Sequence, residues 1–160
     1  MFSITLLAVG KLKERFYAEA VQEYEKRLRG YCRFQLVELP EQRLPEDPNA
    51  AEIAAGLAAE AARIRAAIPK GSYLCVFTPE GKQLSSEAFA EKLRAVKNAG
   101  RSAACFVIGS SFGLDPSVKR QAELCLSFSP MTFPHHLFRI MALEQLYRAE
   151  TIQAGTKYHK

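Results

Sequence analysis

The chain has 160 residues, of which 48% are hydrophobic and 24% are charged, and its net charge is +5. These values are typical of one globular domain with a sizeable core. They argue against a membrane protein, because the apolar runs fall far short of the roughly 20 residues that a span requires. No signal-peptide pattern is visible at the start, so we expect a cytoplasmic protein. The basic excess fits a polyanionic partner, although many proteins without one share it.

Strand-like and helical patterns alternate through the first half of the chain. Apolar, partly β-branched runs predict strands, and apolar residues repeating every three to four positions predict helices. The expected elements are a strand over 3–9, a helix over 13–28, a strand over 32–39, a charged loop over 40–48 and a helix that begins near Asn49 and closes at Pro69.

The second half repeats this alternation. The expected elements are a strand over 72–77, a helix capped by Ser85 or Ser86 and ending at Gly100, a strand over 103–108, a short helix opened by Asp115 and Pro116, a strand over 124–128, a helix from His135 to about Ile152 and a tail over 154–160. Strands that alternate with helices predict an α/β fold with a mostly parallel sheet. We expect one domain over residues 1–160.

Three strand ends are chemically distinctive, and ligands of open α/β sheets bind at such ends. They are the segments 77–82, 108–114 and 128–134. The middle segment contains two glycines but neither nucleotide-binding glycine fingerprint, which disfavours a dinucleotide-binding enzyme. Its glycines fit either a close approach of the backbone or ordinary turns. The last segment is apolar for a loop, which indicates a pocket wall, an interface or a cover for the core.

The last predicted helix and the tail allow two interpretations each. The helix is apolar on more than one side, which fits either a dimer interface or a helix in the centre of the core. The tail is basic and contains aromatic residues, which suits RNA contacts but also a solvated end. The four cysteines form no CxxC pair, so we expect buried, reduced thiols. His135 and His136 lack a third ligand nearby, and we expect no metal site.

Several segments together identify a resemblance to a known family. The C-terminal run is SFSPMTFPHHLFRIMALEQLYRAETIQAGTKYHK, and AVGKLKERFYAEAVQEYEKRL, EGKQLSSE and IGSSFGL stand earlier in the chain. These segments resemble the RlmH (YbeA-like) family of 23S ribosomal RNA pseudouridine-N3 methyltransferases. The similarity spans the whole chain, and the ending Tyr158-His159-Lys160 is its most specific part.

The resemblance implies a fold that the pattern alone would not predict. It is the SPOUT fold, a mostly parallel sheet flanked by helices with a deep trefoil knot near the C-terminus, although knots are almost absent among proteins. The knot and a site for S-adenosylmethionine (SAM) would lie within about residues 72–160. Family members are homodimers with active sites near the dimer interface, and they act on 23S rRNA within the assembled ribosome.

The resemblance also assigns residues to the cofactor. Those carried over are Phe77, Gly109, Phe128, Ser129, Pro130, Met131, Thr132 and Phe133. Two positions depart from the family pattern. Phe77 stands where leucine is common, and should still form an apolar wall for the adenine. Ser110 stands where a second glycine is common, and adds a side chain near the cofactor.

Candidates for the chemistry lie in the last part of the chain. Methyl transfer needs aligned reactants and a deprotonated acceptor nitrogen. We expect His159 as a base, Tyr158 as a residue that stacks on or orients the target base, and Arg139 and Arg148 as electrostatic stabilisers or phosphate contacts.

Three alternatives remain open. The first is a SPOUT enzyme acting on tRNA or another rRNA base, which the Tyr-His-Lys ending disfavours. The second is a non-catalytic ribosome-binding protein, which would keep the basic tail and need no cofactor pocket. The third is a generic α/β nucleotide-binding enzyme, which the missing glycine fingerprints disfavour.

Overall fold

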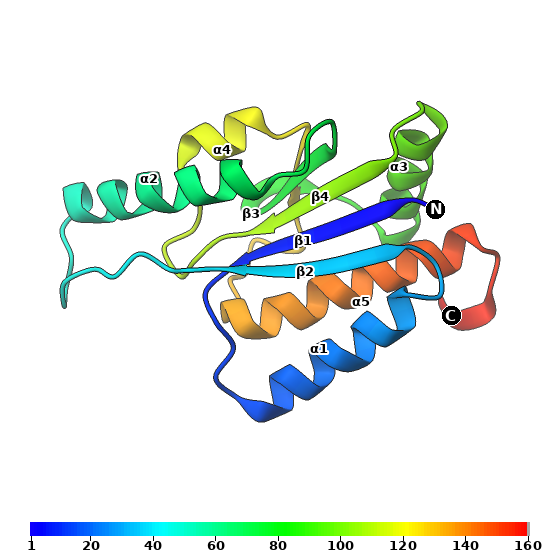
Figure 1. Ribbon diagram of the computed structural model, residues 1–160, viewed down its shortest axis with the longest axis horizontal. Coiled ribbons are helices and arrows are strands. Elements are labelled where there is room, and N and C mark those ends of the chain that lie inside the picture. The colour runs from blue at the N-terminus through cyan, green and yellow to red at the C-terminus, as the bar shows by residue number, and fades with distance from the viewer. Residues whose placement is uncertain (160) are drawn as a thin grey trace.

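A computed structural model of the protein contains one five-stranded sheet flanked by helices (Figure 1). It describes residues 1–159, and for His159 the backbone only. All strand pairs are parallel and the order is β2-β1-β4-β3-β5. The strands are β1 (Ser3–Val9), β2 (Arg33–Leu39), β3 (Tyr73–Gln83), β4 (Ala103–Ile108) and β5 (Leu124–Ser127). The helices are α1 (Arg15–Leu28), α2 (Ala50–Ala67), α3 (Ser86–Asn98), α4 (Pro116–Gln121), α5 (His135–Gln153) and the 3-10 helix η1 (Lys157–His159).

Helices cover both faces of the sheet, so its central strands are buried on two sides. Helices α1, α3 and α5 lie on one face and pack over Leu6 and Phe106. Helices α2 and α4 lie on the other face and pack over Leu7 and Val107. Because successive side chains of a strand point to opposite faces, the continuous apolar runs of β1 and β4 supply both cores. The α/β architecture expected from the alternating pattern is confirmed.

Strand β3 is longer than the predicted strand over 72–77. The apolar pattern stops at Phe77, but after a shift in register Lys82 and Gln83 pair with β5. Gly81 permits this close approach, since a Cβ there would lie 2.6 Å from the Cys125 carbonyl oxygen. The extension is polar and largely exposed, so hydrophobic periodicity could not indicate it.

The predicted helix starts rest on side-chain caps. Asn49 and Glu52 form a reciprocal capping box at the start of α2, and Ser85 accepts the Ala88 amide at the start of α3. Asp115 caps α4 ahead of the first-turn Pro116. Such caps satisfy amide groups that the helix itself leaves unpaired. Helix α1 has no side-chain cap and begins at Arg15, two residues later than predicted.

Helix α5 occupies the middle of its layer. It packs against α1 on one side and α3 on the other, and it buries Leu143 and Leu146. The buried Glu150 carboxylate pairs with Lys97 of α3 at 2.8 Å. A place at the centre of the core thus accounts for most of the helix's two-sided apolar pattern, while Leu137 near its start stays exposed.

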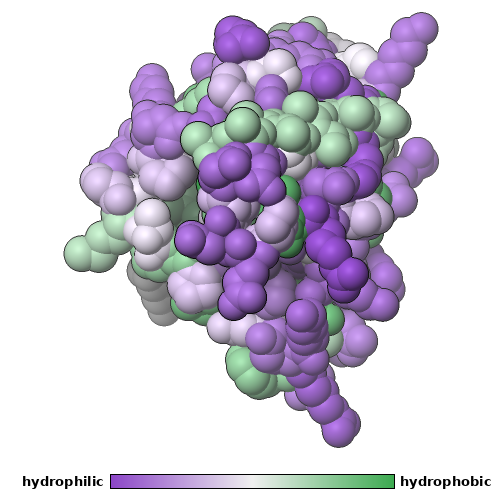
Figure 2. Space-filling view, turned by 90° about the vertical axis from the view of Figure 1, so that its left-hand side faces the viewer, coloured by the Kyte–Doolittle hydropathy of each residue, from purple (hydrophilic) through white to green (hydrophobic). Residues whose placement is uncertain are grey.

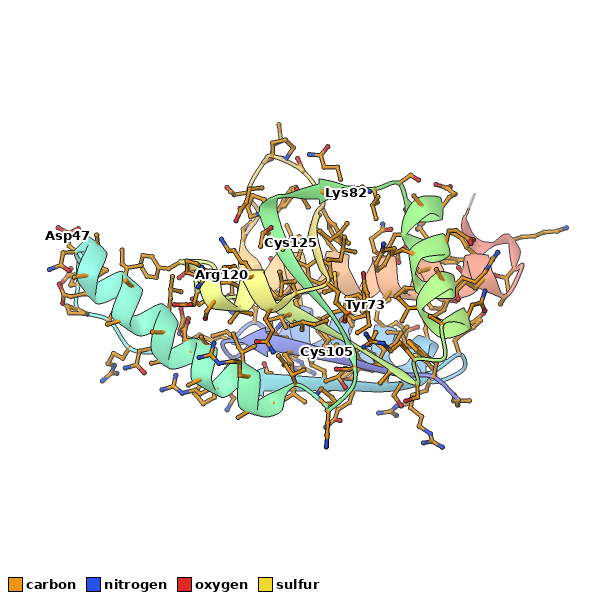
Figure 3. The ribbon with its side chains drawn as sticks, turned by 90° about the horizontal axis from the view of Figure 1, so that it is seen from above. Asp47, Tyr73, Lys82, Cys105, Arg120 and Cys125 are labelled. Atoms are coloured by element: carbon orange, nitrogen blue, oxygen red, sulfur yellow. The ribbon has the colours of Figure 1, made fainter. Side chains whose placement is uncertain are left out.

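The cysteines are free thiols, as expected. Cys105 lies on β4 and Cys125 on β5 (Figure 3). Burial raises the pKa of Cys32 and of Cys105 to about 12, so both stay protonated and unreactive at neutral pH. In the described part of the chain, no helix is long and apolar enough to cross a membrane. No group of three His, Cys, Asp or Glu residues within 1–159 could hold a metal ion.

Candidate functional site

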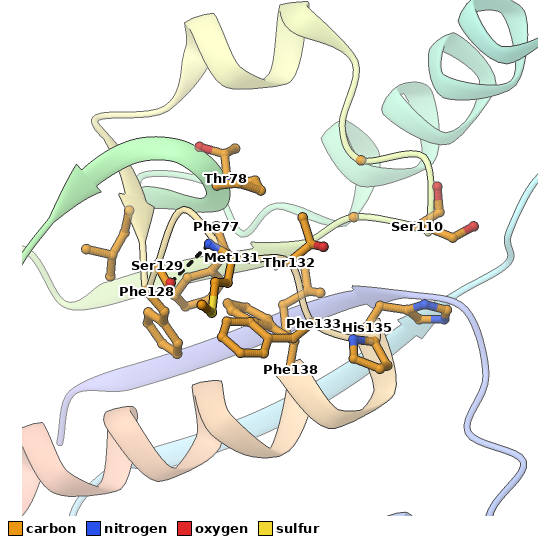
Figure 4. A pocket seen from close by; sticks show the side chains of 17 residues that line it. Phe77, Thr78, Ser110, Phe128, Ser129, Met131, Thr132, Phe133, His135 and Phe138 are labelled. Atoms are coloured by element: carbon orange, nitrogen blue, oxygen red, sulfur yellow. Dashed lines mark hydrogen bonds between the residues drawn. The ribbon is translucent and has the colours of Figure 1, made fainter.

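A cavity of about 490 Å³ opens at the carboxyl ends of β4 and β5 and beside the middle of β3, where the register shift follows Phe77. Its lining residues are Phe77, Thr78, Pro79, Ile108, Gly109, Ser110, Ser111, Gly113, Leu126, Phe128, Ser129, Met131, Thr132, Phe133, Pro134, His135 and Phe138 (Figure 4). Figure 2 views the molecule from this end of the sheet, and hydrophilic residues cover most of the surface there, with hydrophobic residues in smaller groups between them. The cavity has the volume range and mostly apolar lining of small-molecule sites.

The three distinctive strand ends meet at this cavity because β4, β3 and β5 are neighbours in the sheet. Of the residues assigned to the cofactor by resemblance, all but Pro130 line the cavity. The exposed Pro130 lies in the same loop between Ser129 and Met131. Chain order alone could not show that these three segments converge.

Aromatic rings form one wall of the cavity. The Phe77 ring lies edge-on to Phe128 at 5.4 Å and to Phe138 at 5.3 Å between centroids. The rings of Phe128 and Phe138 are 4.8 Å apart. Rings held by one another in this way offer a preformed apolar surface for a flat heterocycle.

The loop after β4 brings backbone close to backbone. A Cβ at Gly109 would lie 2.3 Å from the Gly113 carbonyl oxygen, and Gly113 has a φ of 92°. The Gly113 amide donates to the Ser110 carbonyl at 2.8 Å. Glycine is therefore needed at 109 for the close approach of the backbone and at 113 for the positive φ of a tight turn.

The loop after β5 is held by its own serines. The Ser127 hydroxyl donates to the Ser129 carbonyl at 3.0 Å, and the Ser129 hydroxyl accepts the Met131 amide at 3.0 Å. Met131 is 74% exposed at the rim. A large thioether side chain exposed beside an apolar cavity is free to cover a ligand.

Three polar side chains at the cavity differ in their hydrogen bonding and charge. The Ser110 hydroxyl donates to the buried Glu60 carboxylate at 2.8 Å. The Thr78 hydroxyl is buried and has no hydrogen-bond partner among residues 1–159. His135 stands at the far rim, where burial lowers the pKa of its imidazole and the neighbouring His136 lowers it further. A neutral imidazole at this rim can accept a proton or a hydrogen bond.

Arg139 lies one turn beyond His135 and is fully buried, with 1% of its surface exposed. Its Nη1 donates to Glu38 at 2.6 Å and its Nη2 to the Gly10 carbonyl at 3.0 Å. The guanidinium thus ties the ends of β1 and β2 to α5 beside the cavity. Both ends of the guanidinium are thus bound within the protein, whereas the sequence suggested an electrostatic stabiliser or a phosphate contact.

Arg148 and Tyr158 lie further along α5, around Glu144. Arg148 donates to Glu144, the plain i, i+4 pair that its spacing allowed. Tyr158 also donates to Glu144, at 3.0 Å. Glu144 comes nine residues after His135 of the cavity, so at 1.5 Å per residue the Tyr158 hydroxyl is held about 14 Å further along the helix. The side chain of His159, the expected base, lies outside the described residues.

Some residues at the cavity were not among those expected there. Phe138 lines it, and Glu60 stands directly behind Ser110. Thr78 also lines it, and belongs to the expected segment 77–82 without having been assigned to the cofactor. His135 was not assigned to the cofactor either. Its place between an apolar loop and the start of a helix was the one available signal, since helix starts often border ligand sites. Nothing in the sequence pattern distinguishes Glu60 from other acidic residues of its helix.

Comparisons with known proteins agree with this geometry. The family profile described as "Predicted SPOUT methyltransferase" matches residues 2–159. Ribosomal RNA large subunit methyltransferase H of Leuconostoc mesenteroides is 44% identical over 158 residues, 99% of each chain. The protein of that name from Moorella thermoacetica is 41% identical over 160 residues, 100% of each chain.

Among solved structures, a probable methylase family protein of Haemophilus influenzae superposes with a TM-score of 0.52 at 14% identity, covering 99% of this chain and 70% of that one. That likeness concerns the fold alone. The full-length match to the family profile and to relatives above 40% identity decides the assignment: the chain belongs to the SPOUT methyltransferases and, among them, to the ribosomal RNA large subunit methyltransferase H family.

Proposed function

We propose that the protein is a SAM-dependent methyltransferase that modifies N3 of a pseudouridine in 23S ribosomal RNA. The observation that carries the proposal is the cavity at three adjacent strand ends in a chain that matches this family over its whole length. The proposal includes a single domain over residues 1–160, with the cofactor site and a trefoil knot within about 72–160.

The cavity fits an adenosyl cofactor by its shape and its chemistry. The ring cluster of Phe77, Phe128 and Phe138 offers an apolar surface for an adenine. The loop at Gly109 packs backbone against the backbone of Gly113, and both glycines line the cavity, so main chain forms this part of its wall. Bound there, SAM supplies a methyl group activated by a sulfonium.

The residues of the chain must then hold this cofactor and exclude water. Phe77 and Gly109 form the floor, and the loop of Phe128, Ser129, Pro130, Met131, Thr132 and Phe133 forms the cover. The Ser127 and Ser129 hydrogen bonds fix the shape of this cover before a ligand arrives. A preformed site loses less entropy on binding.

The acceptor nitrogen must lose its proton as it attacks. We assign His159 as the base and Tyr158 as the residue that orients the target ring, with the Arg148 guanidinium over the Tyr158 ring at 5.3 Å. Arg139 has a structural role, because its buried guanidinium donates to Glu38 and to the Gly10 carbonyl. It holds the ends of β1 and β2 in place beside the cavity.

The separation of the tail from the cavity supports a homodimer. Tyr158 is bound to Glu144, about 14 Å along α5 from His135 at the cavity rim, and this contact keeps it away from a base methylated in its own cavity. A partner chain placed with its tail over this cavity would complete the site. The exposed Leu137 and Met131 beside the cavity are apolar surface for such an interface.

The chain is small for an enzyme that must select one nucleotide by itself. A net charge of +5 provides attraction to RNA but no sequence selection. We therefore propose that the assembled ribosome presents the target, and that the enzyme acts in the cytoplasm. No metal ion is required, since the sulfonium itself activates the methyl group.

The test is methyl transfer from labelled SAM to three substrates: intact ribosomes lacking the modification, separated large subunits and naked rRNA. We expect label on a pseudouridine, and only with intact ribosomes. Label on naked rRNA or on tRNA would keep the methyltransferase and change its target. No label, together with no binding of SAM, would overturn the catalytic proposal and leave a ribosome-binding protein.

A further inference from the structure

One face of α2 carries three residues that hold the loop after β2. Gly56, Glu60 and Arg63 are spaced i, i+4 and i+7 and therefore lie on the same side of the helix. A Cβ at Gly56 would lie 2.7 Å from the side chain of Leu44, so that side chain rests directly on the helix.

Hydrogen bonds complete this attachment. One oxygen of Glu60 accepts the Gln42 amide at 2.9 Å. Arg63 donates to the Pro40 carbonyl at 3.0 Å and to the Gln42 side chain at 2.7 Å. The segment 40–44 is thereby fixed to α2 by two hydrogen bonds to its backbone, one to a side chain and an apolar contact.

The second oxygen of Glu60 serves a different loop. It accepts the hydroxyl of Ser110 at 2.8 Å, and Glu60 is 5% exposed and Ser110 7% exposed. Ser110 follows Gly109, and its carbonyl accepts the Gly113 amide. One buried carboxylate therefore joins the loop after β2 to the cavity loop after β4. A buried charged acceptor makes stronger hydrogen bonds than an exposed one, and its loss leaves the donors unpaired.

We infer that Glu60 is a positioning residue of the cofactor site: acting through Ser110, it fixes the loop 109–113 in the shape that binds the adenosyl ligand. The inference rests on the proposed binding of SAM in this cavity. Glu60 does not line the cavity, so it acts on the ligand only through the loop. Ser110 connects Glu60 to the loop, because its hydroxyl donates to the Glu60 carboxylate.

The test is a double-mutant cycle in the binding of S-adenosylhomocysteine, measured by calorimetry on the full-length protein. We expect Glu60→Ala to raise Kd about tenfold, the equivalent of one buried hydrogen bond to a charged group, and Ser110→Ala to raise it several-fold. In the Glu60→Ala background, Ser110→Ala should have no further effect. Additive effects would mean that Ser110 contacts the ligand itself and would overturn the inference, as would an unchanged Kd in both single variants.

Two further variants separate positioning from general stability. Glu60→Gln can still accept the Gln42 amide and donate to Ser110, so we expect it to restore most of the affinity. Arg63→Met loosens the segment 40–44 without touching Ser110, and should lower the unfolding temperature while Kd stays unchanged. A Kd raised as much by Arg63→Met as by Glu60→Ala would mean that the loop after β2 is responsible, and would overturn the inference.

A ligand-free measurement keeps the inference distinct from the proposed function. Hydrogen exchange of the Gly113 amide reports on the loop 109–113, because that amide bonds to Ser110. It should accelerate in Glu60→Ala and in Ser110→Ala, and unchanged exchange in folded variants would overturn the positioning role. Failure of the wild-type protein to bind S-adenosylhomocysteine would instead overturn the proposed function, whatever the exchange shows.

Discussion

At the scale of single residues, burial decides what a charged or polar side chain can do. Arg139 shows this most clearly, since a basic residue near a candidate site suggests a phosphate contact from the sequence. In the structure its guanidinium is buried and satisfies Glu38 and the Gly10 carbonyl. Sequence indicates that an arginine is present on a helix, but its direction depends on how the helix packs.

Arg139→Ala should therefore destabilise the protein. It removes two hydrogen bonds and leaves the Gly10 carbonyl without its donor, so we expect a loss of about 2–3 kcal/mol in the free energy of unfolding, measured in urea. Arg15→Ala is the matched control, because Arg15 also pairs with a glutamate but its side chain is 92% exposed. Equal losses in the two variants would contradict the structural role of Arg139.

Thr78→Val should stabilise the protein. The threonine hydroxyl is buried without a partner among the described residues, and valine has nearly the same shape without the polar atom. Removing an unsatisfied hydroxyl should add about 1 kcal/mol to the free energy of unfolding. Thermal unfolding of the two proteins measures this, and a lower unfolding temperature in the variant would mean that the hydroxyl has a partner in solution.

At the scale of elements, helix α5 connects the cavity to the tail and fixes their separation. The tail is bound to the middle of this helix by a polar cluster in which Tyr24, Arg148 and Tyr158 donate to Glu144. Burial alone would raise the pKa of this carboxyl, but the three donors outweigh it, and the pKa lies below its usual value. The cluster therefore contributes stability only while the carboxyl is ionised.

Glu144→Gln should remove this contribution in a pH-dependent way. A glutamate with a lowered pKa in the folded state stabilises the protein above its unfolded pKa of about 4.5, and the effect disappears as the pH falls through the folded pKa. We expect a loss of about 1–2 kcal/mol at pH 7 that shrinks below pH 4.5. Urea unfolding across this pH range measures it, and a loss independent of pH would contradict the assignment.

The sequence predicted the helices and strands well, but it did not predict which of them lie next to one another in space. Strand β1 and strand β4 have the predicted bounds, because short apolar runs between turns are strong signals. The polar end of β3 was not predicted, because its pairing with β5 depends on the close approach at Gly81 and not on a hydrophobic pattern. The three segments that contribute to the cavity stood out in the sequence as distinctive. Their coming together depends on the strand order, which hydrophobic periodicity does not reveal.

At the scale of the whole molecule, the distance between cavity and tail has a direct consequence for activity. If the tail of one chain serves the cavity of its partner, two inactive variants should complement each other. A cavity variant, Gly109→Val, mixed with a tail variant, Tyr158→Ala, would form mixed dimers with one complete site in two.

With random exchange of subunits, the equal mixture should recover about a quarter of the wild-type methyl transfer, because half of the dimers are mixed and each has one working site. Each variant alone should be inactive. Absence of recovery in a mixture shown to contain mixed dimers would mean that each tail serves its own chain. Binding of S-adenosylhomocysteine should survive in the tail variant and not in the cavity variant.

The strand order also bears on how the chain reaches this structure during synthesis. Strand β1 is made first, yet it lies between β2 and β4, and Ser3 pairs with Ala103. Until about two thirds of the chain has left the ribosome, one edge of β1 has no partner, and apolar residues such as Leu6 and Leu7 lack one of their neighbours. Folding must therefore wait for late contacts between distant parts of the chain, which are slow to form. For most of its own translation the protein thus remains a chain with an exposed strand edge that needs protection from aggregation.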